Sequence, residues 1–247
     1  MKISVLVPVY NETNTIMDIL KLVRGMKLDK EIILVDDCST DGTRDFLKEE
    51  FGDGKEDVRV FYHEKNRGKG AAVRTALEKA TGDYMIVQDA DLEYSPDDIV
   101  RMVGMAQETG AKAVFGSRFL NTWRSTNLFH FIVNKFFTAL TNILYGSSLT
   151  DIHTCYKMVE MDTIRQLDIR AESFAFDPEL CAKLLKRGTK IREIPISYSG
   201  RDHEEGKKIG WPDGVEALWT LLRFRFRDKQ ENEEGIIHEN IRTHAGI

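Results

Sequence analysis

Short apolar runs rich in β-branched residues alternate with amphipathic stretches along the first half of the chain. The runs have the length and composition of strands, and the stretches between them have the pattern of helices. Strands are expected at residues 3–7, 32–35, 58–63, 84–88 and 113–116, and helices at 15–26, 43–51, 68–80 and 97–109. This alternation predicts a mainly parallel sheet flanked by helices.

The second half follows a different pattern. Helices are expected at residues 128–145 and 178–187, and strands at 155–159 and 190–198. We therefore expect one α/β domain over residues 1–227, with an open, mixed, mainly parallel sheet. Residues 228–247 carry five acidic and two basic side chains and are predicted to be a flexible or partner-dependent tail.

Composition narrows the class of protein. The 247 residues are 42% apolar and 30% charged, which supplies a sizeable core and excludes disorder of the whole chain. A net charge of -5 excludes a basic nucleic-acid coat protein. Cys38, Cys155 and Cys181 lack metal-type spacing and predict reduced thiols in a cytosolic protein. The first apolar run is too short for a signal peptide, and residues 128–145 are too often interrupted by polar residues for a membrane-spanning helix.

Two carboxylates separated by one residue, Asp89 and Asp91, follow the predicted strand 84–88. Side chains at i and i+2 of an extended chain point the same way, so both are expected to converge on one cation. Their hard oxygen ligands suit Mg²⁺ or Mn²⁺. The alternative is a solvated turn at the end of a strand.

Two further acidic clusters follow the first two predicted strands. Pro8 to Glu12 reads PVYNE, and Val35 to Thr43 reads VDDCSTDGT. The carboxyl ends of parallel strands meet at one edge of a sheet, where open α/β folds bind ligands, so all three clusters are expected there. Residues 39–41 are typical of a helix N-cap, which does not explain Asp36 and Asp37.

A glycine-bearing loop, Asn66 to Gly70 (NRGKG), opens the predicted helix 68–80. Its amide groups and Lys69 are placed to face phosphate. The loop matches neither the Walker pattern nor GxGxxG. A plain helix start is the alternative reading.

Taken together, the segments VPVYNE, VDDCSTDGT, NRGKGAA, QDADLEYSP and GSRF resemble a family 2 glycosyltransferase of the GT-A, Rossmann-like fold. Within that family, the chain is similar to dolichol-phosphate mannose synthases and polyprenol-phosphate glucosyltransferases. The resemblance spans about residues 1–227. It implies a nucleotide-sugar half over residues 1–120 and an acceptor half with amphipathic helices over residues 121–227.

The same resemblance implies a donor site for UDP-glucose or GDP-mannose. The implied nucleoside pocket consists of Pro8, Tyr10, Glu12, Val35 and Asp37. The implied metal ligands on the donor pyrophosphate are Asp89 and Asp91, with Ala90 against the nucleotide and Glu93 as a further ligand where relatives often have Gln.

Cations are implied around the donor phosphates. Arg118 matches a family arginine that faces them, and Arg201 and Lys207 match a pair that closes over the nucleotide diphosphate. A cationic loop of this kind neutralises the leaving diphosphate and excludes water. A solvated charge run is the alternative for the segment that holds Arg201 and Lys207.

The acceptor decides whether a general base is needed. A polyprenyl phosphate is mainly a dianion at neutral pH, because the second pKa of a phosphate monoester is about 6. One inverting displacement then needs only positioning and stabilisation of the leaving diphosphate. An enzyme that extends a glycan or lipid-linked saccharide would instead use Asp177 as its base. Helix capping is the competing reading of Asp177, with Glu179 an ordinary first-turn acid. A third reading is a non-catalytic nucleotide-binding subunit.

Two segments favour a lipid acceptor. Residues 128–145 place apolar side chains at helical spacing, which a buried core helix explains as well. Residues 212–227 mix aromatic and arginine side chains, as suits an anionic membrane surface, although a solvated basic face competes. We expect the protein at the cytosolic face of a membrane, directly or through a separate membrane subunit.

The acceptor phosphate requires a cation of its own. The register of the family's acceptor arginine falls on Asn134, with Thr138 and Asn142 following it, so that arginine is missing here. Lys135 or Arg124 is expected to replace it beside Arg118.

Overall fold

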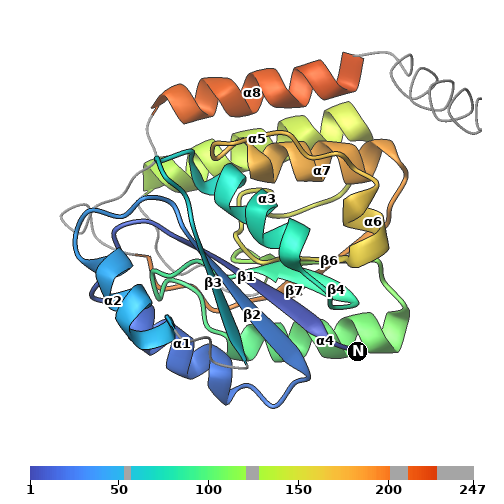
Figure 1. Ribbon diagram of the computed structural model, residues 1–247. Coiled ribbons are helices and arrows are strands. Elements are labelled where there is room, and N and C mark those ends of the chain that lie inside the picture. Colours follow the sequence, from blue (N-terminus) through green and yellow to red (C-terminus); the bar gives the residue numbers. More distant parts are fainter. Residues whose placement is uncertain (53–56, 121–127, 201–210, 227–247) are drawn as a thin grey trace, which may run out of the picture.

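The computed structural model describes residues 1–52, 57–120, 128–200 and 211–226, which form a seven-stranded sheet with helices on both faces (Figure 1). The strands are β1 (Ile3–Val9), β2 (Lys30–Asp36), β3 (Val58–Tyr62), β4 (Tyr84–Val87), β5 (Ala113–Ser117), β6 (Lys157–Glu160) and β7 (Ile191–Pro195). The helices are α1 (Ile16–Gly25), α2 (Thr43–Phe51), α3 (Lys69–Lys79), α4 (Asp97–Thr109), α5 (Leu128–Tyr145), α6 (Met161–Arg165), α7 (Phe176–Lys186) and α8 (Trp211–Phe226). The α/β prediction is confirmed.

The strand order is β3-β2-β1-β4-β6-β5-β7, and only β6 runs antiparallel to its neighbours. The prediction of an open, mixed, mainly parallel sheet is therefore confirmed. β1 extends past its expected end, through Pro8 to Val9. Its ladder with β4 stops where Leu6 faces Val87, and Pro8 pairs only with Val35 of β2. Proline has no N–H to donate, and Pro8 is tolerated because β1 no longer pairs with β4 at that position.

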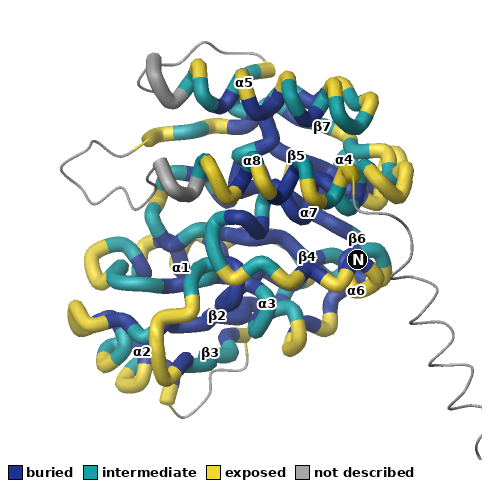
Figure 2. Tube along the Cα trace, turned by 90° about the horizontal axis from the view of Figure 1, so that it is seen from above, coloured by how far each residue is buried: buried dark blue, intermediate teal, exposed yellow. Residues whose placement is uncertain are grey.

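The core lies between the sheet and the helices, where the five inner strands β2, β1, β4, β6 and β5 are almost continuously buried, whereas the edge strands β3 and β7 are mostly half-buried (Figure 2). Strands covered on both faces read as unbroken apolar runs, which is why β1 and β2 were detectable from sequence. α3 packs on β1 and β2, and α4 packs on β5 on the opposite face (Figure 1). α8 is the outermost element, beyond α5 and α7.

Several expected boundaries differ from the observed ones, and the strand expected at residues 190–198 is β7 over Ile191–Pro195 only. The strand expected at residues 155–159 begins only at Lys157, and the short helix α6 was not expected. Helix α7 begins two residues before its expected start, with Ala175 as the N-cap residue and no side-chain cap. Asp177 therefore lies inside the first turn, and the capping interpretation fails. No helix within the described parts of the chain is long and apolar enough to cross a bilayer.

Candidate active site

The motif-bearing strand ends meet at one edge of the sheet, as predicted. β2, β1 and β4 are parallel neighbours, so Asp37, Asn11 and Asp89 follow one another along that edge. β6 is antiparallel, so its beginning, rather than its end, reaches the same edge beside β4. The end of β5, which carries Arg118, follows next.

Three non-glycine residues in the left-handed region mark this edge. Asn11, Cys38 and Leu92 have φ values of 55°, 65° and 62° and follow β1, β2 and β4, respectively. Such conformations are uncommon outside glycine and tend to gather at functional sites. Here they turn the chain sharply at the end of each strand.

The two acidic residues that end β2 hold the surrounding loops. Asp36 is fully buried and accepts a hydrogen bond from Arg44 Nε at 2.6 Å. Asp37 accepts hydrogen bonds from the backbone N–H of Arg67 at 2.9 Å and of Gly68 at 2.7 Å, and its Oδ1 lies 2.7 Å from His63 Nδ1. Asp37 thus shapes the glycine loop, while its role in the nucleoside pocket stays a prediction.

The expected cap before α2 takes a modified form. The N-cap residue is Gly42, with φ of 95°, and none of residues 39–41 occupies that position. Asp41, the residue before this N-cap, nevertheless accepts a hydrogen bond from the Thr43 N–H at 3.0 Å. Ser39 Oγ instead accepts the Asn11 N–H at 2.9 Å, which joins the loops after β1 and β2.

The glycine loop packs against residues 171–173. A Cβ on Gly68, whose φ is 92°, or on Gly70 would collide with the carbonyl groups of Glu172 or Ala171. Glu179 fixes that segment because its carboxylate accepts the N–H groups of Arg170 and Ala171. It is 2% exposed, so the expectation of an ordinary first-turn acid is wrong. This packing places the Lys69 side chain beside Asp89, with Lys69 Nζ 2.7 Å from Asp89 Oδ1.

Asp89 and Asp91 lie together, although not for the predicted reason. β4 ends at Val87, so both carboxylates sit on the turn that follows it rather than on an extended chain. Burial and the charges of Asp89 and Glu93 raise the pKa of Asp91 to about 7. The turn thus holds more negative charge than its surroundings stabilise, which suits a bound cation.

The donor set fits Mg²⁺ or Mn²⁺. Such ions bind through one or two carboxylates and complete their coordination with waters and substrate phosphates. Glu93 accepts a hydrogen bond from the Tyr198 hydroxyl at 3.0 Å. In the described residues, no three His, Cys, Asp or Glu side chains form a ready metal-binding group. Asp89, Asp91 and Glu93 all stay predicted ligands.

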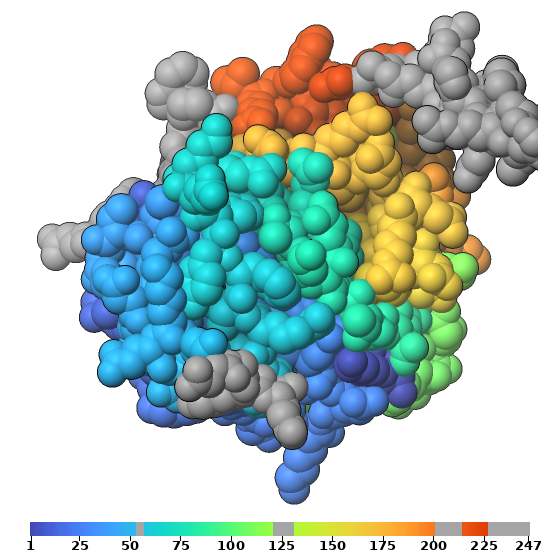
Figure 3. All heavy atoms as spheres, viewed as in Figure 1, coloured from blue at the N-terminus to red at the C-terminus, as the bar shows by residue number. Residues whose placement is uncertain are grey.

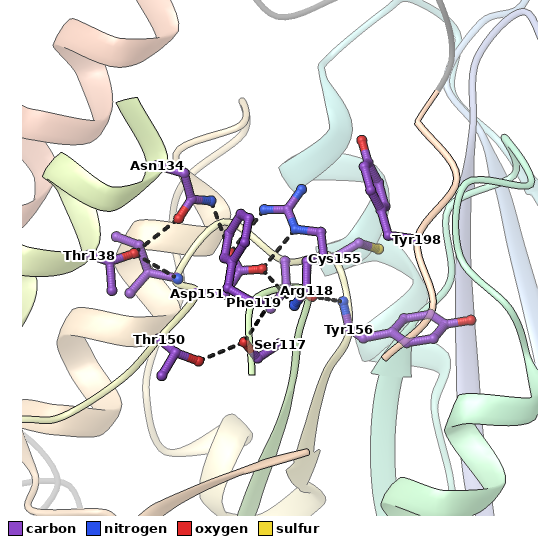
Figure 4. Close-up of polar contacts among 12 residues, drawn as sticks. Ser117, Arg118, Phe119, Asn134, Thr138, Thr150, Asp151, Cys155, Tyr156 and Tyr198 are labelled. Carbon is purple, nitrogen blue, oxygen red and sulfur yellow. Dashed lines mark hydrogen bonds and ion pairs between the residues drawn. The ribbon is translucent and has the colours of Figure 1, made fainter. Parts of the chain in front are cut away.

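Arg118 is held by a residue that the sequence did not single out. Its guanidinium makes two hydrogen bonds to Asp151, Nε to Oδ2 at 2.7 Å and Nη2 to Oδ1 at 2.9 Å (Figure 4). Asn134 of α5 donates to the same carboxylate at 2.9 Å, and Thr138 donates to Asn134. The guanidinium also lies 5.0 Å from the centroid of the Tyr198 ring. No sequence spacing links Arg118 to Asp151, so the pairing was not predictable.

Lys135 reaches the same place from α5. Its Nζ donates to the Thr150 carbonyl at 3.1 Å and lies 4.4 Å from the centroid of the Phe119 ring. The Arg118 guanidinium lies 5.5 Å from that ring. The structure therefore brings together two of the cations expected at the acceptor phosphate. Arg124, Arg201 and Lys207 lie outside the described residues.

Asp177 faces a buried lysine. Its Oδ1 lies 2.7 Å from Nζ of Lys157, which is 0% exposed and also donates to the Thr154 carbonyl. Asp177 is the partner of that buried charge, a role that the sequence did not reveal. Its role as a base stays a prediction.

The remaining residues predicted for the donor site differ in their exposure. Pro8, Tyr10 and Glu12 are half-buried, whereas Val35 and Ala90 are buried. Their part in nucleoside binding stays a prediction.

Helix α5 does not fully bury its apolar side chains, which a core helix would do. Phe136 is 57% exposed and Ile143 80%, whereas Asn134, Thr138 and Thr141 face inward. The core interpretation of this helix is therefore wrong for Phe136 and Ile143. On neighbouring α8, Trp219 and Phe226 are 64% and 73% exposed. Figure 3 shows α8 across the top of the molecule, at its surface.

Comparison with known proteins places this geometry in a family. Glycosyl transferase family 2 matches residues 4–167 of the chain. The chain belongs to glycosyltransferase family 2. The predicted family is thereby confirmed, and so is the GT-A fold class.

Two curated relatives support a glycosyltransferase enzyme. The hexosyltransferase Agl6 of Haloferax volcanii, named for low-salt glycan biosynthesis, is 25% identical over 228 residues, which cover 90% of this chain and 52% of Agl6. The chain thus spans about half the length of that relative. The undecaprenyl-phosphate mannosyltransferase of Micrococcus luteus is 25% identical over 248 residues, covering 91% of this chain and 99% of the relative.

A solved structure shares the fold. Glucosyl-3-phosphoglycerate synthase from Mycobacterium tuberculosis, in complex with Mn²⁺, UDP and phosphoglyceric acid, superposes with a TM-score of 0.68 at 19% identity. The match covers 92% of this chain and 80% of that one. At this identity the likeness is one of fold alone.

Proposed function

We propose that the protein is an inverting, metal-dependent glycosyltransferase that moves a hexose from UDP-glucose or GDP-mannose to a polyprenyl phosphate at the cytosolic face of a membrane. The two faces of α5 carry this proposal. Its inner side brings Lys135 to Arg118, which lies over the Tyr198 ring beside the turn of Asp89, Asp91 and Glu93, here called the metal-binding turn. Its outer side exposes Phe136 and Ile143. One helix therefore joins a phosphate-binding site to a surface suited to lipid.

The donor half of the proposal rests on the acidic turn and on Lys69. Asp89 and Asp91 would hold Mg²⁺ or Mn²⁺, which when bound stabilises the negative charge of the donor pyrophosphate. Lys69 lies at the same carboxylate and adds a positive charge toward the phosphates. The solved relative in complex with Mn²⁺ and UDP supports this class of donor.

The acceptor half rests on two cations and on the state of Asp177. A phosphate dianion needs no general base, and Arg118 and Lys135 would position it for attack on the anomeric carbon. Asp177 is engaged by the ammonium of Lys157, which supports a phosphate acceptor over an alcohol acceptor. The relative named undecaprenyl-phosphate mannosyltransferase supports the same choice.

The membrane half of the proposal rests on α5 and α8 together. Exposed Phe136, Ile143 and Trp219 supply apolar surface, and Arg223 and Arg225 near the end of α8 supply positive charge for anionic lipids. The protein would bind the membrane through this surface, directly or beside a membrane subunit. The enzyme would comprise residues 1–227, with residues 228–247 as a tail.

A lipid-transfer assay tests the proposal. Purified protein is incubated with undecaprenyl phosphate, Mn²⁺ and radiolabelled UDP-glucose or GDP-mannose, and label is counted in the organic phase. We expect metal-dependent transfer that Asp91→Asn abolishes and that the exposed control Asp97→Asn preserves. Lys135→Ala should raise the KM for the lipid without changing that for the donor. Label in the lipid with the donor's anomeric configuration retained would contradict inversion, and absence of lipid-linked label would contradict the acceptor.

A further inference from the structure

His153 lies where the donor and acceptor halves of the site meet. It belongs to the segment that leads into β6 and lies against the metal-binding turn, since Cys155 Sγ contacts the Val87 carbonyl at 3.6 Å and the Tyr156 hydroxyl donates to Gln88 at 2.6 Å. The same segment pairs with the end of β5, where the Gly116 N–H donates to the Tyr156 carbonyl, and the charges of Arg118 and Asp151 act on the His153 ring. His153 therefore stands between the residues proposed for the pyrophosphate and those proposed for the acceptor phosphate.

The imidazole of His153 has an unsatisfied nitrogen. Nε2 is buried and has no hydrogen-bond partner among the residues that the structure describes. The ring packs edge-on against Phe137, with centroids 5.3 Å apart. Burial and the positive charge of Lys157 lower the pKa of His153 to about 4. At neutral pH the ring is therefore uncharged and carries one N–H donor and one acceptor nitrogen.

The charged groups around His153 are already paired with one another. Arg118 is paired with Asp151, and Lys157 with Asp177. An unpaired buried polar atom costs free energy that an apolar side chain of the same shape would not. An apolar ring of the same shape would pack on Phe137 without that cost, and the unmatched nitrogen thus points to a partner that binds from outside.

We infer that His153 hydrogen-bonds a hydroxyl group of the donor's hexose and so takes part in selecting the sugar. This inference rests on the proposed function. A neutral imidazole suits an uncharged hydroxyl, whereas the phosphates on either side are matched by cations. The sugar is bonded to the pyrophosphate and is attacked by the acceptor, so it must lie between the two, which is where His153 stands. The ring reaches the sugar by turning about its Cβ–Cγ bond, a torsion with broad preferences.

Calorimetric titration of UDP and UDP-glucose, and of GDP and GDP-mannose, with Mn²⁺ tests the inference. His153→Phe keeps the ring shape and removes the hydrogen bond. We expect it to weaken binding of the sugar nucleotide about 3- to 10-fold while leaving the nucleoside diphosphate unchanged. His153→Gln, which restores an N–H, should recover part of the loss. The melting temperature of His153→Phe should equal or exceed that of the wild type.

Deoxy donors and a packing control sharpen the test. One monodeoxy form of the hexose should bind wild type and His153→Phe equally, because it lacks the hydroxyl that His153 contacts. Phe137→Leu disturbs the packing of the ring and should leave sugar-nucleotide affinity within about twofold. Equal sugar-nucleotide affinities for wild type and His153→Phe, or an equal loss in Phe137→Leu, would overturn the inference alone. A wild-type protein that binds neither nucleotide would overturn the proposed function together with it.

Discussion

Helices α4 and α5 are both amphipathic, yet they turn opposite kinds of side chain toward the protein. α4 buries Ile99, Met102 and Val103 against the sheet. α5 buries Asn134, Thr138 and Thr141 beside Phe137 and leaves Phe136 and Ile143 in the open. α4 is therefore held by apolar packing, whereas α5 is held in large part by hydrogen bonds.

The difference lies in what the buried side chains of α5 contact. Buried polar groups must be paired, and those of α5 are: Asn134 with Asp151, Thr138 with Asn134, and Thr141 with the Phe137 carbonyl. These contacts stabilise the protein less than apolar burial would, but they fix Asp151 and, through it, Arg118. Because the inner side of α5 is occupied by these polar contacts, apolar side chains such as Phe136 and Ile143 lie on its solvent-exposed side.

The largest effect is expected where the polar contacts of α5 meet Arg118. Asp151→Ala leaves the guanidinium of Arg118 buried without a counter-charge and should lower the free energy of unfolding by about 3–5 kcal/mol. Denaturant unfolding measures this, with exposed Asp162→Ala, expected within about 0.5 kcal/mol of wild type, as the control. A loss below about 1 kcal/mol for Asp151→Ala would mean that Arg118 does not depend on this pair.

Truncating an apolar side chain on each helix tests the contrast itself. Met102→Ala on α4 should cost about 2–5 kcal/mol, because it empties part of the core. Phe136→Ala on α5 should cost about 0.5 kcal/mol or less, because the ring is already solvated. Thermal and chemical unfolding of the two variants decide the matter. Similar losses would show that α5 packs in the same way as α4.

Low pH should destabilise the protein by protonating Asp151, which pairs with Arg118 and accepts a hydrogen bond from Asn134 of α5. Burial by itself would raise its pKa, but the charge of Arg118 and the hydrogen bonds from Arg118 and Asn134 outweigh it and lower the pKa to about 2. Because this value lies below the ordinary one, the pair adds about 2 kcal/mol above pH 4, which is lost as the pH falls toward 2. Unfolding measured between pH 2 and 5 should show a shallower loss in Asp151→Asn. Equal slopes in the two proteins would contradict the shifted pKa.

The smallest effect concerns the outer sides of the helices. Phe136→Glu should weaken binding to vesicles of equal parts phosphatidylglycerol and phosphatidylcholine about 10-fold, since it removes apolar area and adds a negative charge. Val100→Glu is the matched control, because Val100 is an exposed apolar residue of α4, at 38% exposure. Co-sedimentation measures both. An equal loss in the two variants would remove the distinction between the helices, and no loss in either would remove α5 from the membrane surface.

The sequence by itself determined the class of sheet and the position of the motifs on it. Unbroken apolar runs such as those of β1 and β2 identify strands covered on both faces, and parallel strands bring their carboxyl ends to one edge. Asp37, Asp89 and Asp91 could therefore be placed at that edge without coordinates. These signals are local, because periodicity and turn residues are read over a few neighbouring positions.

Only the tertiary structure decided which groups are partners and which side of α5 faces inward. Arg118 and Asp151 are 33 positions apart, and Lys157 and Asp177 are 20 apart, with no pattern that joins them. A helical pattern shows that α5 has an apolar and a polar side, but it does not show which side faces the rest of the protein. That choice is made by Asp151 and its hydrogen bonds, because the free energy of a buried polar group depends on partners brought from elsewhere in the chain.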